Sequence, residues 1–340
     1  MNAVPHTRSL ATAALIVVSI GCGVDDGSAG PDGPPAPCPS VLAHGEGTRG
    51  NYVLYLWSVD GGRAVAVDDD VARPIEISRS IAIDQRHQRG AGLAVGGGIA
   101  WFRLTGGQPP SFQASGVRGV WRWDDDGMLV SVGGALARIA FGTNTLIQLA
   151  PGDPTGYWGY PAGSPDGSRL LAVRFDNGTA VIHEIAPDQT TRPLTGVPGT
   201  SLVGWSPDGA WFATIDRATR VMVVDATTLV AHEVASGSID DAAWSSSEAR
   251  LMVTGLIDGA RRVVAMAPDG SDRVDVTTWR APSPVAWGAD GRQLLWVESA
   301  PSLATTMMTG DSHGLAKHAV GNPSPIRTVD GLWLVDPCLR

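Results

Sequence analysis

The side chains best suited to catalysis or metal binding are scattered along this chain rather than grouped. Its histidines lie far apart, at positions 6, 44, 87, 183, 232, 313 and 318. A zinc site needs several such ligands at short spacing, so these histidines are interpreted as surface or packed residues. The acidic runs 68–70 and 124–126 lack the alternating spacing of a calcium loop and are interpreted as solvated turns. We therefore predict no catalytic residue, no metal site and no cofactor.

The charge of the chain argues against one large class of partner. Its 25 Lys and Arg residues against 34 Asp and Glu residues give a formal net charge of −9. Binding of a polyanion requires clustered basic residues, so nucleic acid is not an expected partner. A serine hydrolase is not expected either, because the sequence does not show the alternating strands and helices of an α/β catalytic domain.

The N-terminus has the pattern of an export signal. Basic residues end at Arg8, and a mostly apolar run follows that is too short to span a bilayer as a helix. Ser19-Ile20-Gly21-Cys22 resembles the lipobox of bacterial lipoproteins, in which the cysteine is acylated. The resemblance implies a signal peptide at 1–21, lipidation of Cys22 and, because Gly23 follows the cysteine, location at the outer membrane. An ordinary secretory leader is the alternative.

Residues 22–50 are predicted to be a tether. They are rich in Gly, Pro, Asp and Ser and contain little that could be buried. The chain would then contact the membrane through its N-terminal lipid only. The folded domain is expected at 51–340.

The remaining chain contains an internal repeat. The clearest copies are Val203-Gly204-Trp205-Ser206-Pro207-Asp208-Gly209 and Val285-Ala286-Trp287-Gly288-Ala289-Asp290-Gly291. The last positions of all copies are residues 127, 167, 209, 248, 291 and 331, which lie 39 to 43 residues apart. Each copy is interpreted as an apolar strand that ends in a tryptophan, followed by an Asp-Gly reversal and a returning strand. We expect the in-frame tryptophans 205, 244 and 287 to pack between repeats, and this period is typical of β-propeller blades.

The Trp-Ser-Pro-Asp-Gly frame and the strand-like segment 223–228 together resemble the repeats of TolB-like propellers. The resemblance extends over residues 75–336 and implies an all-β propeller. The pattern predicts seven four-stranded blades, and six blades, the number in TolB, is the alternative. The additional N-terminal domain of TolB has no counterpart in the pattern.

The two ends of the repeat region are predicted to share one blade. Residues 324–329 and 332–336 would supply two of its strands, and residues 52–57 and 63–67 the other two. Such a velcro closure removes open sheet edges. It would bring Cys38 close to Cys338, so a disulfide between them is predicted, with two unpaired thiols as the alternative.

The predicted binding face is the one where connections between blades converge around the central axis. Aromatic side chains occur there at positions that the repeat does not require, and polar side chains accompany them. The candidate partner-binding residues are Asp153, Tyr157, Trp158, Tyr160, Arg217, Trp279 and Arg280. Ordinary loop packing is the alternative explanation for these residues.

The sequence as a whole predicts a monomeric, non-catalytic module of the cell envelope whose loops bind a protein or peptide, as the TolB-like resemblance implies. The alternative is a propeller-fold enzyme, a hydrolase or lyase, that acts on glycans. That reaction would need convergent carboxylates. Asp153, Asp176 and Asp240 are the loose candidates for them.

Overall fold

The computed structural model describes the backbone of the β-rich part of the chain. The described residues are 16–17, 40–46, 52–58, 65–66, 81–84, 89–93, 99–103, 111–112, 117–123, 127–140, 145–152, 154–277, 282–287, 291–299, 305–313, 317–321 and 329–335. Over these ranges the ordered elements are strands, and no helix in them is long and apolar enough to cross a membrane. The all-β prediction is confirmed.

The strands form six sheets, and neighbouring strands within each sheet are antiparallel. The first half of the chain supplies β1 (Ile16–Val17), β2 (Ser40–Glu46), β3 (Tyr52–Ser58) and β4 (Val65–Ala66); β5 (Ile81–Asp84), β6 (Arg89–Leu93), β7 (Ile99–Arg103) and β8 (Ser111–Phe112); and β9 (Val117–Trp123), β10 (Gly127–Val132), β11 (Ala135–Ala140) and β12 (Leu146–Ala150).

The second half continues the series. It supplies β13 (Gly156–Gly163), β14 (Leu170–Asp176), β15 (Thr179–Ile185) and β16 (Thr191–Pro193); β17 (Ser201–Trp205), β18 (Trp211–Asp216), β19 (Arg220–Asp225), β20 (Ala231–Trp244), β21 (Leu251–Ile257), β22 (Ala260–Met266) and β23 (Val274–Thr277); and β24 (Pro282–Trp287), β25 (Gln293–Ser299), β26 (Thr305–Asp311), β27 (Lys317–Gly321) and β28 (Val329–Val335).

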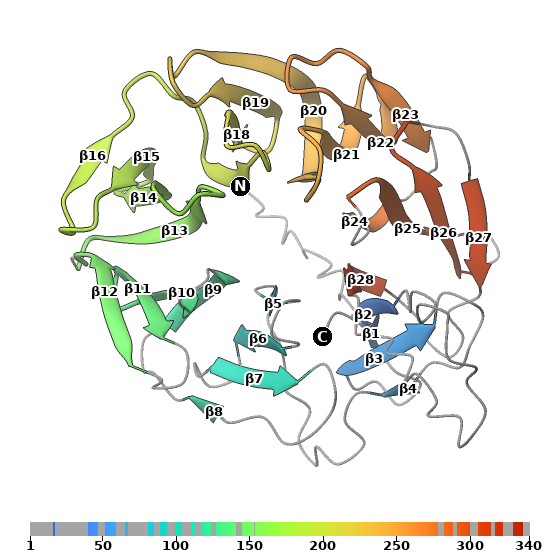
Figure 1. Cartoon of the computed structure of the whole chain (residues 1–340), viewed down its shortest axis with the longest axis horizontal. Coiled ribbons are helices and arrows are strands. Elements are labelled where there is room, and N and C mark those ends of the chain that lie inside the picture. The colour runs from blue at the N-terminus through green and yellow to red at the C-terminus, as the bar shows by residue number, and fades with distance from the viewer. Residues whose placement is uncertain are drawn as a thin grey trace, which may run out of the picture.

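The sheets lie side by side around a ring (Figure 1). In each four-stranded sheet the first strand is nearest the centre, as β9, β13 and β24 show. These inner strands contact one another in succession, β5 with β9, β9 with β13, β13 with β17, β17 with β20, β20 with β24, and β24 with β28. We call β13 to β16 the β13 sheet, β17 to the first half of β20 the β17 sheet, and the second half of β20 to β23 the β21 sheet.

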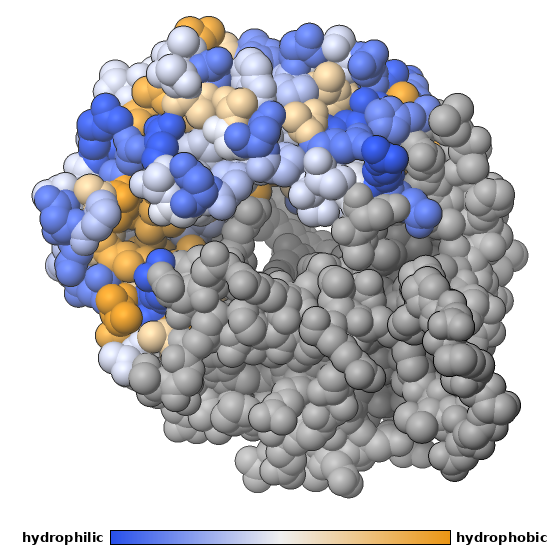
Figure 2. Space-filling model, in the orientation of Figure 1, coloured by the Kyte–Doolittle hydropathy of each residue, from blue (hydrophilic) through white to orange (hydrophobic). Residues whose placement is uncertain are grey.

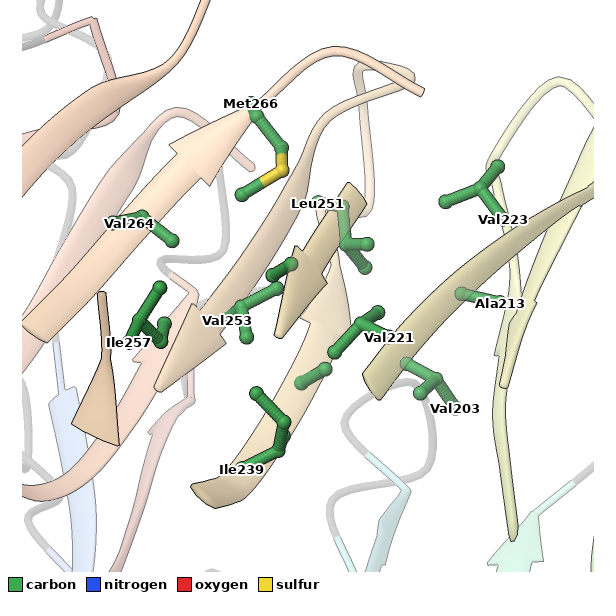
Figure 3. Packing of buried hydrophobic residues seen from close by; sticks show 12 residues of the cluster. Val203, Ala213, Val221, Val223, Ile239, Leu251, Val253, Ile257, Val264 and Met266 are labelled. Atoms are coloured by element: carbon green, nitrogen blue, oxygen red, sulfur yellow. The ribbon is translucent and has the colours of Figure 1, made fainter. Parts of the chain in front are cut away.

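The apolar cores lie between the faces of neighbouring sheets. One cluster joins the β17 and β21 sheets, with Val203, Val221, Leu251 and Val253 among its buried members (Figure 3). A second joins the β13 and β17 sheets. Because both faces of a middle strand are covered, such strands are apolar almost throughout, as β19 and β21 are.

The tryptophans of the repeat connect neighbouring sheets as predicted. The indole Nε1 of Trp205 donates a hydrogen bond to the Ala162 carbonyl of the preceding sheet (3.0 Å). Trp244 and Trp287 make the same bond to Gly204 and Ala243, each over 2.9 Å. The polar tip of each indole is therefore satisfied while its ring contributes to the core.

The strands at the two ends of the chain differ from the prediction. The segment 329–331 was expected to turn, but β28 runs through it as one strand and pairs with β2. A register shift lets the pairing skip Asp330, so the Asp-Gly pair forms an irregularity in a strand rather than a reversal. The strand β2 lies within the predicted tether segment 22–50, so strand pairing begins before residue 51.

Candidate functional site

The hairpin turns between the second and third strands of four consecutive sheets share one backbone conformation. Both residues at the tip of each turn have positive φ, in two-residue loops in three of the sheets and in the three-residue loop 217–219 of the fourth. They are Gly133-Gly134, Asn177-Gly178, Arg217-Ala218 and Asp258-Gly259. Because Gly156 pairs with Asp176, and Ser201 with Ile215, the inner strands β13 and β17 begin beside these turns. We call the turns and these strand starts the rim.

Three aromatic side chains gather on the rim of the β13 sheet. Tyr157 lies opposite Phe175 on the neighbouring strand, and their rings stack with centroids 4.8 Å apart. The ring of Tyr160 lies 6.0 Å from that of Phe175. Tyr160 is 38% exposed, whereas the other two are half-buried. These residues form the aromatic cluster, and Phe175 is the member that the sequence analysis missed.

Tyr160 is held in a strained backbone conformation. Its φ is 49°, and within the described strands it is the only residue other than glycine in the left-handed region. The strand β13 has a register shift between Gly159 and Ala162, so Tyr160 lies in a bulge. A bulky residue in this region is unfavourable and persists only where its surroundings hold it, often at functional sites. Burial, and secondarily Tyr157, raise the pKa of Tyr160 above its ordinary value of 10.0.

The same bulge explains why Trp158 is not on the surface. Residues two apart in a regular strand share a face, but the bulge places Trp158 and Tyr160 on opposite faces. Trp158 is only 3% exposed and packs with Leu136 and Ala150 of the preceding sheet. Its Nε1 donates to the Pro151 carbonyl (2.9 Å). In this structure the Trp158 ring is therefore part of the core between two sheets and not of the exposed rim.

Arg217 lies on the neighbouring turn of the rim, and its backbone is fixed from both sides. Its N–H donates to Thr200 Oγ1 at the start of β17 (2.9 Å). The next two carbonyls of the turn, those of Ala218 and Thr219, accept hydrogen bonds from the N–H groups of Ile239 and Gly237 in β20, each over 2.8 Å. The turn is thus joined to the inner strands of two sheets.

The aromatic cluster and the Arg217 turn lie on two sheets whose inner strands contact each other. Phe175 packs against the buried cluster that contains Leu202, and Leu202 follows Thr200 closely along β17. The strands β13 and β17 contact each other directly. Two of the predicted partner-binding residues, Tyr157 and Tyr160, are therefore on one side of this junction and a third, Arg217, is on the other.

The carboxylates nearest the Arg217 turn already have partners. Asp216 forms an ion pair with Arg220, and Asp240, in the bulge of β20, forms one with Arg261. The Arg217 side chain is exposed. Every other arginine side chain that the structure describes has an ion pair, a hydrogen bond or a ring contact, and that of Arg217 has none of these. Asp176 is exposed on the adjacent turn.

Most other chemistry-bearing groups have structural roles. His232 contacts the Pro268 carbonyl (2.7 Å), and the His183 ring packs edge-on against Trp158. Residues 310–314 match the Gly-x-Ser-x-Gly pattern that surrounds the nucleophile of many serine hydrolases. Ser312, however, is fully buried just after β26, and its carbonyl accepts hydrogen bonds from Arg250. It therefore lacks the exposure of a nucleophile. In the described ranges, no group of three or more His, Cys, Asp or Glu residues could hold a metal ion.

Several predicted residues lie outside the described part of the chain. They are Cys22, Cys38, Asp153, Trp279, Arg280 and Cys338, together with the acidic runs 68–70 and 124–126.

Around the described part of the ring the surface is mostly hydrophilic, and the molecule is hollowed at its centre (Figure 2). Apolar surface is more extensive near β12, where Leu146 and Ile147 are 44% and 43% exposed.

The ring of antiparallel sheets defines the chain as a β-propeller protein. It is similar to TolB from Acinetobacter baumannii, with a TM-score of 0.52, 14% identity, and coverage of 87% of this chain and 66% of that one. This supports the TolB-like resemblance at the level of the fold. The chain spans less than two thirds of TolB's length. No family model and no curated protein matches the sequence.

Two enzymes share the fold. Puromycin hydrolase has a TM-score of 0.60 at 16% identity, with 86% of this chain and 55% of that chain covered. An oligogalacturonate lyase in complex with manganese has a TM-score of 0.56 at 11% identity, with 71% and 76% covered. These similarities contradict the prediction that the chain is not an enzyme, because the fold on which that prediction relied also carries catalysis.

Proposed function

We propose that the rim at the junction of the β13 and β17 sheets binds a protein or peptide segment, with Tyr157, Tyr160 and Arg217 as its principal contacts. The observation that carries the proposal is the left-handed conformation of Tyr160, which directs a large ring out of the inner strand at a conformational cost. A residue chosen for strand stability alone would be glycine at this φ. Tyrosine and arginine are also the residue types that most often dominate protein interfaces.

The proposal is tested by affinity selection. Immobilised full-length protein is incubated with a pool of random nonapeptides, and the retained peptides are identified by mass spectrometry. We expect wild type to retain a reproducible subset and Tyr160→Ala to retain at least about tenfold less of it, since truncation of a central aromatic contact commonly costs 2 kcal/mol or more.

The matched control is Val230→Ala. Val230 is 64% exposed but lies in the turn between β19 and β20, at the opposite end of the β17 sheet from Arg217. Its truncation should leave the retained subset unchanged. Retention of nothing by wild type, or of the same peptides by Tyr160→Ala, would refute binding at the rim.

A glycan-directed enzyme is the alternative function. The reaction needs two facing carboxylates, and of the candidates at the rim Asp240 is paired with Arg261 while Asp176 is exposed on another turn. The same preparation is assayed with oligogalacturonate, the substrate class in the name of one structural neighbour. Turnover there would favour the enzyme over the peptide-binding proposal.

Ring closure and attachment complete the proposal. Counting β28 with β2 to β4, and dividing the seven-stranded sheet at β20, supports seven blades closed by strands from both ends of the chain. A Cys38–Cys338 disulfide would lock this closure, and non-reducing peptide mapping would detect it.

Lipidation at Cys22 would place the ring at the outer membrane. Cys22→Ala should then move the protein from the membrane fraction to the soluble fraction.

A further inference from the structure

Two ion pairs lie next to the turn that carries Arg217. Asp216 is paired with Arg220 and Asp240 with Arg261, so these two carboxylates are matched to arginines other than Arg217, while Asp176 lies exposed at the end of the neighbouring strand β14. Asp240 directly follows Ile239, whose N–H is bonded to the turn, yet it does not engage Arg217. The Arg217 guanidinium is therefore exposed at this point of the rim without an ion pair.

The backbone beneath this charge is costly and rigid. The φ values of Arg217 and Ala218 are 50° and 57°, and the three equivalent turns place glycine at the second of these positions. A left-handed alanine costs about 1–2 kcal/mol relative to ordinary helical or extended backbone. Hydrogen bonds to Thr200, Ile239 and Gly237 hold the turn in place. The guanidinium is thus presented from a fixed base, which reduces the entropy lost when a ligand binds.

From these observations we infer that Arg217 anchors a carboxylate of the peptide that binds at the rim. The inference rests on the proposed peptide-binding function and names the group recognised there. A guanidinium offers two parallel N–H donors that match the two oxygens of a carboxylate. The exposed Tyr160 ring on the other side of the junction supplies an apolar surface for an adjacent side chain of the same peptide. The carboxylate can come from an acidic side chain or from the C-terminus of the peptide.

The experiment uses two pools of random nonapeptides, one with a free C-terminal carboxylate and one amidated. We expect wild type to retain peptides enriched in Asp or Glu from both pools if a side chain is the source. If the C-terminus is the source, retention should be confined to the free-acid pool. Arg217→Gln should lose either preference and weaken the best peptide by about tenfold, the range of a charged hydrogen bond. Arg217→Lys, which keeps the charge but not the fork, should lie between the two.

The control is Arg192→Gln, which makes the same change in net charge. Arg192 is 69% exposed and pairs with Glu184 on the outer part of the β13 sheet, away from the rim. It should bind peptides as wild type does. Circular dichroism melting of all variants checks that each is folded.

The outcomes separate this inference from the proposed function. Peptides retained through Tyr160 with no preference for a carboxylate, or with the same preference in Arg217→Gln, would overturn the inference and leave rim binding intact. Failure of wild type to retain any peptide would overturn both. Loss of the preference in both Arg217→Gln and Arg192→Gln would show a general charge effect and also overturn the inference.

Discussion

The β13 and β17 sheets solve the same two backbone problems in opposite ways. Both inner strands contain a bulge, and both sheets have a rim turn with two consecutive residues of positive φ. In the β17 sheet the residue that follows the bulge is Gly204 at φ 133°, whereas in the β13 sheet the bulge itself contains Tyr160 at φ 49°. The turn of the β13 sheet uses Gly178, whereas that of the β17 sheet uses Ala218.

Each sheet therefore has one relaxed and one strained element, and the two strained elements are on the same junction. A repeat that needed only to fold could use glycine at all four positions. The contrast between these strained positions and the relaxed ones is the ground on which we propose that Tyr160 and Arg217 bind a ligand. The buried tryptophans show the contrasting case, because Trp205 and its counterparts are where the repeat predicts them.

The largest expected effect comes from separating the two sheets. Trp205→Ala removes a side chain that is 8% exposed and bonded to Ala162 across the junction. We expect a loss of about 3–5 kcal/mol in the free energy of unfolding, measured by urea titration with far-UV circular dichroism. Trp205→Phe keeps most of the buried area and should cost less. A loss below about 1 kcal/mol for the alanine variant would mean that the Trp205 ring and its bond to Ala162 do not hold the two sheets together.

Exchanging glycine and alanine between the rim turns of the two sheets should change the unfolding free energy by a smaller amount, with opposite signs for the two variants. Gly178 has φ 80° and open space around its Cβ position, so Gly178→Ala introduces conformational strain alone and should cost about 1 kcal/mol of unfolding free energy. Ala218→Gly should raise the unfolding free energy by about the same amount, because it relieves the strain of φ 57°. Equal signs for the two variants would contradict the assignment of strain to the β17 turn.

The smallest effect concerns the ionisation of Tyr160. Its raised pKa means that the folded state holds the phenolic proton more tightly than the unfolded state does. The resulting stabilisation is fully present below pH 10 and is lost as the pH rises through the folded-state pKa. With only four tyrosines in the chain, ultraviolet difference titration of wild type against Tyr160→Phe can resolve this group. A midpoint at or below 10 for Tyr160 would contradict its burial.

The features that sequence could predict are those that depend on neighbouring residues. The Ser-Pro-Asp-Gly turn is closed locally, since Ser206 Oγ donates to Asp208 Oδ1 (2.5 Å) and accepts from the Trp211 N–H (3.0 Å). Such turns, and the tryptophans before them, are therefore visible as a repeat. A blade shared by the two ends of the chain was predicted, but the pairing of β2 with β28 joins segments almost 300 residues apart, and no local pattern marks 40–46 as the strand that makes it.

The site was predictable in part for a related reason. Alternation along a strand assigns Trp158 and Tyr160 to one face, and only the bulge in β13 separates them. The loss of tryptophan from the repeat frame at Gly163 was visible, but its replacement by Trp158, which bonds to Pro151 from an earlier position in the strand, was not. Phe175 became a candidate only when the register placed it opposite Tyr157.

The strand β20 is 14 residues long and belongs to two sheets, as the outer strand beside β19 and then as the inner strand beside β21. Two neighbouring blades therefore share a continuous ladder of backbone hydrogen bonds without a loop between them. Because one strand pairs with β19 through its first half and with β21 through its second, unfolding of β20 would remove the partner of both, and we expect the backbone amides of β19 and β21 to become accessible to deuterium in a single cooperative event. The β17 and β21 sheets would then behave as one foldon, and the turn that carries Arg217 would share their rigidity.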